Sequence, residues 1–120
     1  MKPIVSESVY KKLITILKKI KVPGEEQLHA ELLNAEVVKD SELKKDIVSL
    51  NSIVEFTIGS LRKPLRLKIV LPEEADLRKR KISIFAPISI ALIGFRESYS
   101  YKWLMPSGEK ELRILKVVNE

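Results

Sequence analysis

The chain has 120 residues, of which 45% are hydrophobic and 32% are charged, and its formal net charge is +6 at pH 7. This composition is typical of one soluble globular domain, and no apolar run approaches the roughly 18 residues of a membrane span. The chain has no cysteine and one histidine, His29, which excludes disulfides, thiolate metal sites and imidazole clusters. Because its first ten residues also lack the apolar segment of a signal peptide, we expect a cytoplasmic protein without membrane attachment, metal or cofactor.

The first predicted element is an amphipathic helix. Apolar residues with spacings of four, three and four form the a/d pattern of a short coiled coil, namely Val9, Leu13, Ile16 and Ile20. The segment Val22-Pro23-Gly24 interrupts this pattern, and a second helix follows in which one face carries Leu28, Leu32 and Ala35. The two stretches predict an antiparallel helical hairpin over residues 6–38, with no strand before residue 40. With about 15 residues per helix at roughly 1.5 Å each, the hairpin should project as an arm of about 22 Å.

The stretch from Lys39 to Asp46 is charged and has no hydrophobic period. Stretches of this kind connect regular elements rather than forming them. We therefore predict a domain boundary there, with the hairpin in residues 1–46 and a globular domain in residues 47–120.

Beyond this boundary the hydrophobic period changes to two, which predicts strands. The clearest alternation is that of Leu65, Leu67, Ile69 and Leu71, and further strands are predicted over residues 54–58, 82–85, 99–104 and 111–118. Gly59-Ser60 and Pro106-Ser107-Gly108 supply the turns between neighbouring strands. A short apolar helix should begin at Pro87 and end at Gly94. The predicted fold class is α+β, with a helical hairpin followed by a five-stranded antiparallel sheet and one short helix.

The densest positive charge is the run Arg78-Lys79-Arg80-Lys81. Such a run can contact phosphates or an acidic protein surface, or it can simply be a solvated loop. Because no aromatic residues alternate with these basic residues as a stacking platform for single strands would require, we do not expect nucleic acid as a direct partner. A basic nucleic-acid-binding module stays an alternative, and steep weakening of binding with salt would be its signature.

Several segments together identify a family resemblance. They are "VSLNSIVEF", "IVLPEEAD" and "KISIFAPISIALIG", followed by Trp103, Pro106 and Gly108. In this order and spacing they resemble the GreA/GreB family, and its Rnk-like members in particular, over roughly residues 28–118. The resemblance implies an N-terminal coiled-coil hairpin, a C-terminal domain of FKBP-like fold, and binding to RNA polymerase at its secondary channel.

The resemblance also implies a docking site at the strand-to-helix junction. In the cleavage factors of this family, the residues just before and at the matching proline, typically Asp-Ser-Pro or Thr-Ser-Pro, contact the rim of the channel. Here that place reads Phe85, Ala86 and Pro87, followed by Ile88, and Rnk-like proteins likewise carry an apolar residue and alanine before the proline. The alternative is that Phe85 packs inward and Pro87 merely starts the helix.

The tip of the predicted hairpin carries two acidic residues, Glu25 and Glu26. Cleavage factors of the family use an acidic pair at the tip of a longer hairpin to help hold a metal ion in the polymerase active site. Acids in the first turn of a helix are also favoured by its dipole, which is the simpler explanation of this pair. Because the arm is about half as long as that of a cleavage factor, we expect a non-catalytic regulator that competes with cleavage factors at the channel.

Two other functions stay open at this point. One is a cleavage factor of the Gre type. The other is a prolyl isomerase, suggested by the FKBP-like fold alone, although the aromatic residues that could line its pocket are scattered along the sequence: Phe56, Phe85, Phe95 and Trp103. The sequence does not indicate an oligomeric state.

Overall fold

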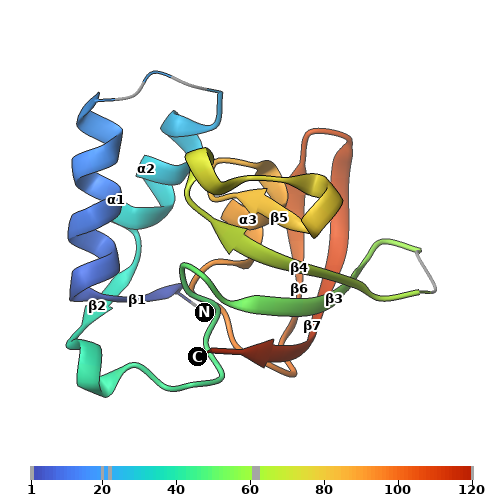
Figure 1. The fold of residues 1–120 in the computed structure, drawn as a ribbon. Coiled ribbons are helices and arrows are strands. Elements are labelled where there is room, and N and C mark those ends of the chain that lie inside the picture. The colour runs from blue at the N-terminus through green and yellow to red at the C-terminus, as the bar shows by residue number, and fades with distance from the viewer. Residues whose placement is uncertain (1, 20, 22, 61–62, 120) are drawn as a thin grey trace.

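A five-stranded sheet forms the centre of the molecule (Figure 1). The structure is a computed structural model that describes residues 2–19, 21, 23–60 and 63–119. The strands of this sheet are β3 (Ile53–Ile58), β4 (Leu65–Val70), β5 (Lys81–Ser83), β6 (Ser100–Met105) and β7 (Gly108–Val118). Their order is β5-β4-β3-β7-β6, and the short helix α3 (Pro87–Leu92) follows β5. The predicted α+β class, with five strands and a short helix in this part of the chain, is confirmed.

The prediction of a fully antiparallel sheet is wrong at one edge, because β5 pairs with β4 in parallel. Two 3-10 turns, η2 (Pro72–Glu74) and η3 (Leu77–Lys79), lie between the two strands and bring the chain back beside the second half of β4, where Lys81 pairs with Lys68. A hairpin turn would have reversed the chain direction, whereas this longer connection keeps it the same. The other neighbouring pairs, β3 with β4, β3 with β7 and β6 with β7, are antiparallel.

The alternating pattern of the strands separates the two faces of the sheet. In β3 the side chains of Val54 and Phe56 are fully buried, and the intervening residues are only partly so. In β7 the fully buried side chains are Leu112 and Ile114. Helix α3 belongs to the same core through Ile90, Ala91 and Leu92, so one face of the sheet is covered and the other is open.

The second N-terminal helix ends earlier than predicted, and two short strands flank the pair of helices. Helix α1 spans Glu7–Lys19 and α2 spans Glu25–Leu33, while β1 (Ile4–Ser6) pairs in parallel with β2 (Glu36–Val38). The expectation of no strand before residue 40 is therefore wrong. The β-branched pair Val37 and Val38 favours a strand over a helix, which explains why the second helix stops short of it.

The strand β1 is also attached to the end of α3. The backbone N–H of Ile4 donates a hydrogen bond to the carbonyl oxygen of Gly94 at 2.9 Å. A Cβ atom at Gly94 would collide with Pro3, so glycine is required for this close approach, and its φ of +86° favours glycine as well. The first residues of the chain are thus held against its second half.

The helices do not project as an arm, which corrects the second expectation for this region. Figure 1 shows α1 and α2 lying alongside the sheet domain, and the molecule measures 37 × 31 × 27 Å. The fully buried residues of the helices, Leu13, Leu28 and Leu32, belong to the same hydrophobic cluster as the sheet and α3. Helices of 13 and 9 residues are too short to be stable alone, so their apolar faces pack on the nearest apolar surface.

Only some residues of the predicted coiled-coil seam are buried in the core. Leu13 is fully buried, whereas Val9 and Ile16 are half-buried at the margin of the core, and Ala35 is half-buried as well. Ile20 and Val22 lie outside the described residues.

The division of the chain at residue 46 and the FKBP-like description of the second part stay predictions. No helix in the described part of the chain is long and apolar enough to cross a bilayer.

Candidate functional site

The junction between β5 and α3 is ordered by short-range hydrogen bonds. The Ser83 hydroxyl oxygen accepts the N–H of Phe85 at 3.1 Å, and the Ser83 carbonyl oxygen accepts the N–H of Ala86 at 3.0 Å. Ala86 occupies the N-cap position of α3 in an extended conformation but offers no side-chain acceptor, and Pro87 fills the first helical position. The missing N–H of proline is harmless there because the first turn of a helix leaves its N–H groups unpaired.

The four residues predicted to contact the polymerase differ in their exposure. Phe85 is 5% exposed and belongs to the hydrophobic core, as the alternative interpretation of its role requires. Ala86 and Ile88 are half-buried, and Pro87 is exposed. The surface of this junction is therefore formed by Ala86, Pro87 and part of Ile88, with Phe85 as the anchor beneath it. Their binding role stays a prediction.

The turn between α1 and α2 packs directly on this junction. Gly24, in that turn, has a φ of +94°, and a Cβ atom there would collide with the carbonyl oxygen of Phe85 and lie 3.6 Å from Cδ1 of Ile90. Only glycine allows both this backbone conformation and this approach. The tip of the helix pair and the predicted docking residues are thus parts of one continuous surface.

This surface contains a shallow hollow of about 340 Å³. Three prolines from three separate segments line it, Pro23 of the helix turn, Pro72 of η2 and Pro87 of α3, together with Ser83, Phe85 and Ala86. Proline rings hold a fixed shape, so this hollow presents a rigid, largely apolar surface. Of these three prolines only Pro87 was predicted to belong to this surface, because nothing in the linear order shows that the three segments meet.

The two acidic residues of the tip lie in different environments. The Glu25 carboxylate forms an ion pair with Lys21 at 3.4 Å, and its side chain is only 20% exposed, whereas Glu26 is exposed. The Oε2 atom of Glu25 is buried and makes no hydrogen bond to a described residue. Within the described residues, no group of three or more histidine or acidic side chains is placed to hold a metal ion.

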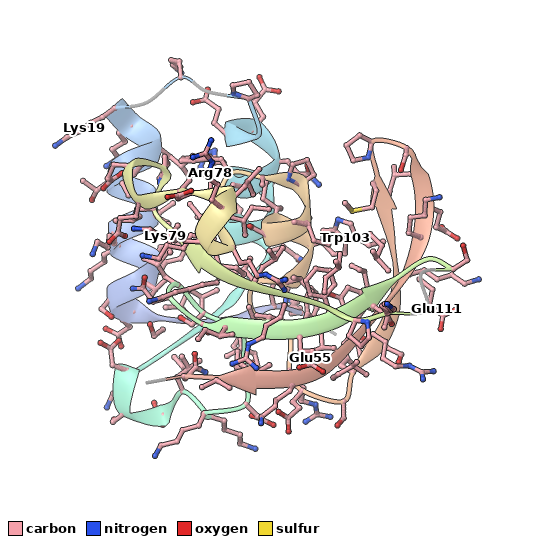
Figure 2. All side chains as sticks on the ribbon, turned by 45° about the vertical axis from the view of Figure 1, so that its right-hand side comes forward. Lys19, Glu55, Arg78, Lys79, Trp103 and Glu111 are labelled. Carbon is pink, nitrogen blue, oxygen red and sulfur yellow. The ribbon has the colours of Figure 1, made fainter. Side chains whose placement is uncertain are left out.

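The basic run forms part of a turn rather than a free loop. Arg78 and Lys79 belong to η3, Arg80 follows it with a left-handed φ of 57°, and Lys81 begins β5. The Asp76 carboxylate accepts the N–H of Arg78 at 3.1 Å and caps this turn. Figure 2 shows Arg78 and Lys79 on this segment, well separated from Trp103, which belongs to β6.

Four aromatic rings gather at the margin of the core next to α3. Phe95 packs against Tyr99, Tyr101 and Trp103 with ring centroids 5.8, 4.7 and 5.9 Å away. The Tyr101 hydroxyl donates to the carbonyl oxygen of Ala91 at 2.5 Å. Burial, and to a lesser extent the repulsion that an ionised Tyr99 would exert, raises the pKa of Tyr101, so its hydroxyl stays a neutral donor. Phe95 is buried in the core, and so are Phe56 and Phe85, but neither of these two takes part in the ring contacts of this cluster.

The comparison with known families gives one match, over residues 43–119, to the C-terminal domain of the transcription elongation factors GreA and GreB. The chain is 35% identical over 95 residues to transcription elongation factor GreA of Pelobacter propionicus, a match that covers 79% of this chain and 60% of the relative. It is also 31% identical over 87 residues to the regulator of nucleoside diphosphate kinase of Escherichia coli, covering 72% of this chain and 64% of the relative. Each match thus spans less than two thirds of the curated relative.

Two solved structures resemble this chain in fold. The GreA/GreB transcription elongation factor of Nitrosomonas europaea is 33% identical, covers 99% of both chains and superposes with a TM-score of 0.78. The GreA factor homolog Gfh1 of Thermus thermophilus has a TM-score of 0.51 at 17% identity, which shows a likeness of fold alone.

Proposed function

Because the chain belongs to the GreA/GreB family of transcription elongation factors and has Rnk-like relatives, we propose that it is a transcription regulator that binds RNA polymerase at the mouth of the secondary channel. It docks through the surface formed by Ala86, Pro87 and Ile88, with Phe85 as the buried anchor. It contributes no catalytic group and competes with cleavage factors for the same place. A cytoplasmic location follows from this role and stays a prediction.

One observation supports this proposal above the others: the contact of Gly24 with the carbonyl group of Phe85. Because of this contact, the turn that carries Glu25 and Glu26 lies close to the residues proposed to dock instead of far beyond them. When the junction sits on a partner surface, Glu25 and Glu26 lie close to that surface and do not reach deeply into a channel. This supports a role in occupying the channel mouth rather than in delivering carboxylates to the polymerase active site.

The state of Glu25 supports the same conclusion. Its carboxylate is already paired with Lys21 and mostly buried, so one of the two acids is not presented to solvent. The side chains of adjacent residues on a helix also point about 100° apart. Two acids in this arrangement do not converge on one metal ion without a rearrangement of the turn.

The test is binding of the purified protein to core RNA polymerase in the presence of increasing amounts of a cleavage factor. We expect displacement in proportion to concentration, because both proteins would occupy one rim. Simultaneous binding of both proteins would contradict the proposed location, and no binding at all would contradict the proposed partner.

Several of the relatives are named GreA, which favours transcript cleavage as a second candidate function. It is tested with stalled transcription complexes in magnesium. We expect no stimulation of cleavage beyond the polymerase alone. Stimulation that disappears in a Glu25→Gln, Glu26→Gln variant, but persists when the exposed acids Glu73 and Glu74 are changed in the same way, would establish the cleavage function instead.

A further inference from the structure

A second hollow lies at the open face of the sheet, at the edge formed by β4 and β5. It has a volume of about 210 Å³. Its lining consists of five basic residues and two apolar ones: Arg66, Lys68, Lys79, Arg80, Lys81, Ile53 and Leu67. Three residues of the basic run thus meet two basic residues of β4, whereas Arg78 is not among the lining residues. We propose that this hollow, called here the basic hollow, binds the sugar–phosphate backbone of nucleic acid without reading its base sequence.

No acidic side chain in the described part of the chain forms an ion pair with the basic residues of this hollow. Within the described residues, the structure contains one ion pair, and it joins Lys21 to Glu25. Lys68 lies directly opposite Lys81 in the register of β4 and β5, and neighbouring strands are only about 4.8 Å apart. Like charges in such a position repel each other. Glu55, the cross-strand partner of Arg66, is near enough in register to compensate in part but forms no ion pair with it.

The basic residues are also held in place. The backbone N–H of Lys68 donates to the carbonyl oxygen of Arg80 at 2.9 Å, which fastens the turn to β4. Lys81 and Asp76 exchange two backbone hydrogen bonds, at 2.9 and 3.0 Å, which close the base of the turn. Arg80 adopts a left-handed conformation that residues other than glycine seldom adopt. These bonds fix the backbone of the turn against β4, so the attachment points of the basic side chains lie side by side, while their charged ends are free to adjust to a ligand.

The composition of the lining favours nucleic acid over an acidic protein segment. Three of the five basic residues are lysines, and lysine is depleted at protein–protein interfaces, whereas protein–nucleic acid interfaces are strongly positive. The two apolar lining residues, Ile53 and Leu67, are only partly exposed and offer no aromatic anchor of the kind that dominates protein interfaces. The aromatic cluster around Phe95 lies elsewhere, next to α3, so bases cannot stack in the hollow.

The test is fluorescence anisotropy of the full chain with a labelled duplex DNA and a single-stranded RNA of the same length, over a series of salt concentrations. We expect binding to both, at least as strong for the duplex because its charge density is higher, with log affinity falling linearly with log salt concentration. Arg66→Gln, Lys68→Gln should weaken binding roughly tenfold at low salt for any base sequence, and the loss of two phosphate contacts should reduce the salt slope by about 1.8 on the duplex.

The matched control is Lys12→Gln, Lys19→Gln, which removes the same charge from two exposed residues of α1 outside the hollow. Both variants should melt within a few degrees of the unaltered protein, because Lys12, Lys19 and Arg66 are exposed and Lys68, although half-buried, is not part of the hydrophobic core. An equal loss of affinity in both variants would overturn the proposal, because net charge alone would then explain binding. Tighter binding of a poly-glutamate peptide than of either nucleic acid would also overturn it in favour of an acidic protein partner. The assay contains no polymerase, so a negative result leaves the proposed docking function standing.

Discussion

Gly24 packs so closely on the carbonyl group of Phe85 that a Cβ atom at Gly24 would collide with the carbonyl oxygen. This contact joins the turn of the helix pair to the junction that carries the predicted docking residues. Its consequences for stability and function can be measured separately.

Gly24→Ala should destabilise the protein by more than backbone strain explains. The left-handed conformation alone costs about 1–2 kcal/mol for a residue with a side chain, and the collision with Phe85 adds to it. Gly108→Ala is the control, because Gly108 also has a positive φ, of +117°, but has nothing within 4 Å of its Cβ position. Urea unfolding of both variants measures the difference, and equal losses would mean that the contact with Phe85 contributes nothing.

Leu28→Ala should destabilise the whole molecule, by about 2–5 kcal/mol, because Leu28 is fully buried in the shared core. Leu33→Ala, at a residue of the same helix that is 68% exposed, should change stability by less than about 0.5 kcal/mol. Unfolding followed by far-UV circular dichroism and by Trp103 fluorescence should give one coincident transition in each case. A Leu28→Ala variant that lost helix signal while its Trp103 transition stayed unchanged would show that the helices are an independent unit.

Asp40 should make stability depend on pH in the acid range. Its carboxylate lies at the start of α1, where Oδ1 accepts the N–H of Ser8 at 3.0 Å, and hydrogen bonding by the Ser8 side chain and backbone lowers the pKa of Asp40. A lowered pKa stabilises the folded state above the unfolded value, near 3.9, and this contribution is lost as the pH falls through the folded value. Asp40→Ala should therefore have a lower free energy of unfolding than the unaltered protein at pH 7, and this difference should shrink as the pH falls below the unfolded pKa and through the lowered folded one.

Glu42→Ala is the control for Asp40, because Glu42 is an exposed acid of the same 3-10 turn, η1 (Asp40–Glu42). It should leave both the stability at neutral pH and its acid dependence nearly unchanged. The difference in free energy of unfolding between Asp40→Ala and the unaltered protein is the quantity to follow. If it stayed constant from pH 7 to pH 3, the hydrogen bond from Ser8 to Asp40 would not depend on the charge of the carboxylate.

Pro87→Asn should weaken binding to core RNA polymerase at least several-fold while shifting the melting temperature only slightly. Pro87 is exposed at the first position of α3, so the substitution changes the surface and not the core. Pro106→Asn, at an exposed proline between β6 and β7, is the control for a general effect of losing a proline. A large drop in melting temperature without a separate loss of binding would assign Pro87 a purely structural role.

The five strands of the sheet and helix α3 were predictable from local hydrophobic patterns. Apolar and polar residues alternate along the strands, and apolar residues are concentrated in the short helix. Residues 65–71 illustrate this: the alternation locates β4 to within one residue. The same pattern does not tell which surface covers the apolar face. The spacing of Leu28 and Leu32 is equally compatible with a seam between two hairpin helices and with a helix face packed on a domain. In the structure they pack in the core shared with the sheet.

The candidate surfaces were predictable only where they are local in the sequence. Phe85 to Ile88 and Arg78 to Lys81 are contiguous, so they could be identified as segments. Pro23 and Pro72 join the first surface, and Arg66 and Lys68 the second, through turn packing and strand register that no local pattern records. The inward position of Phe85 likewise depends on a partner far away in the chain, the turn at Gly24.

The hydrogen bond between Ile4 and Gly94 can form only after residue 94 has been synthesised, and strands β6 and β7 of the sheet follow later still. Helices α1 and α2 are made first, but the surface that buries Leu13 and the residue that fastens β1 are translated much later. A ribosome that pauses before residue 94 therefore carries a nascent chain whose apolar helix faces are still uncovered. Since such faces attract other chains, the speed of translation through this last third should influence how much protein reaches the native state.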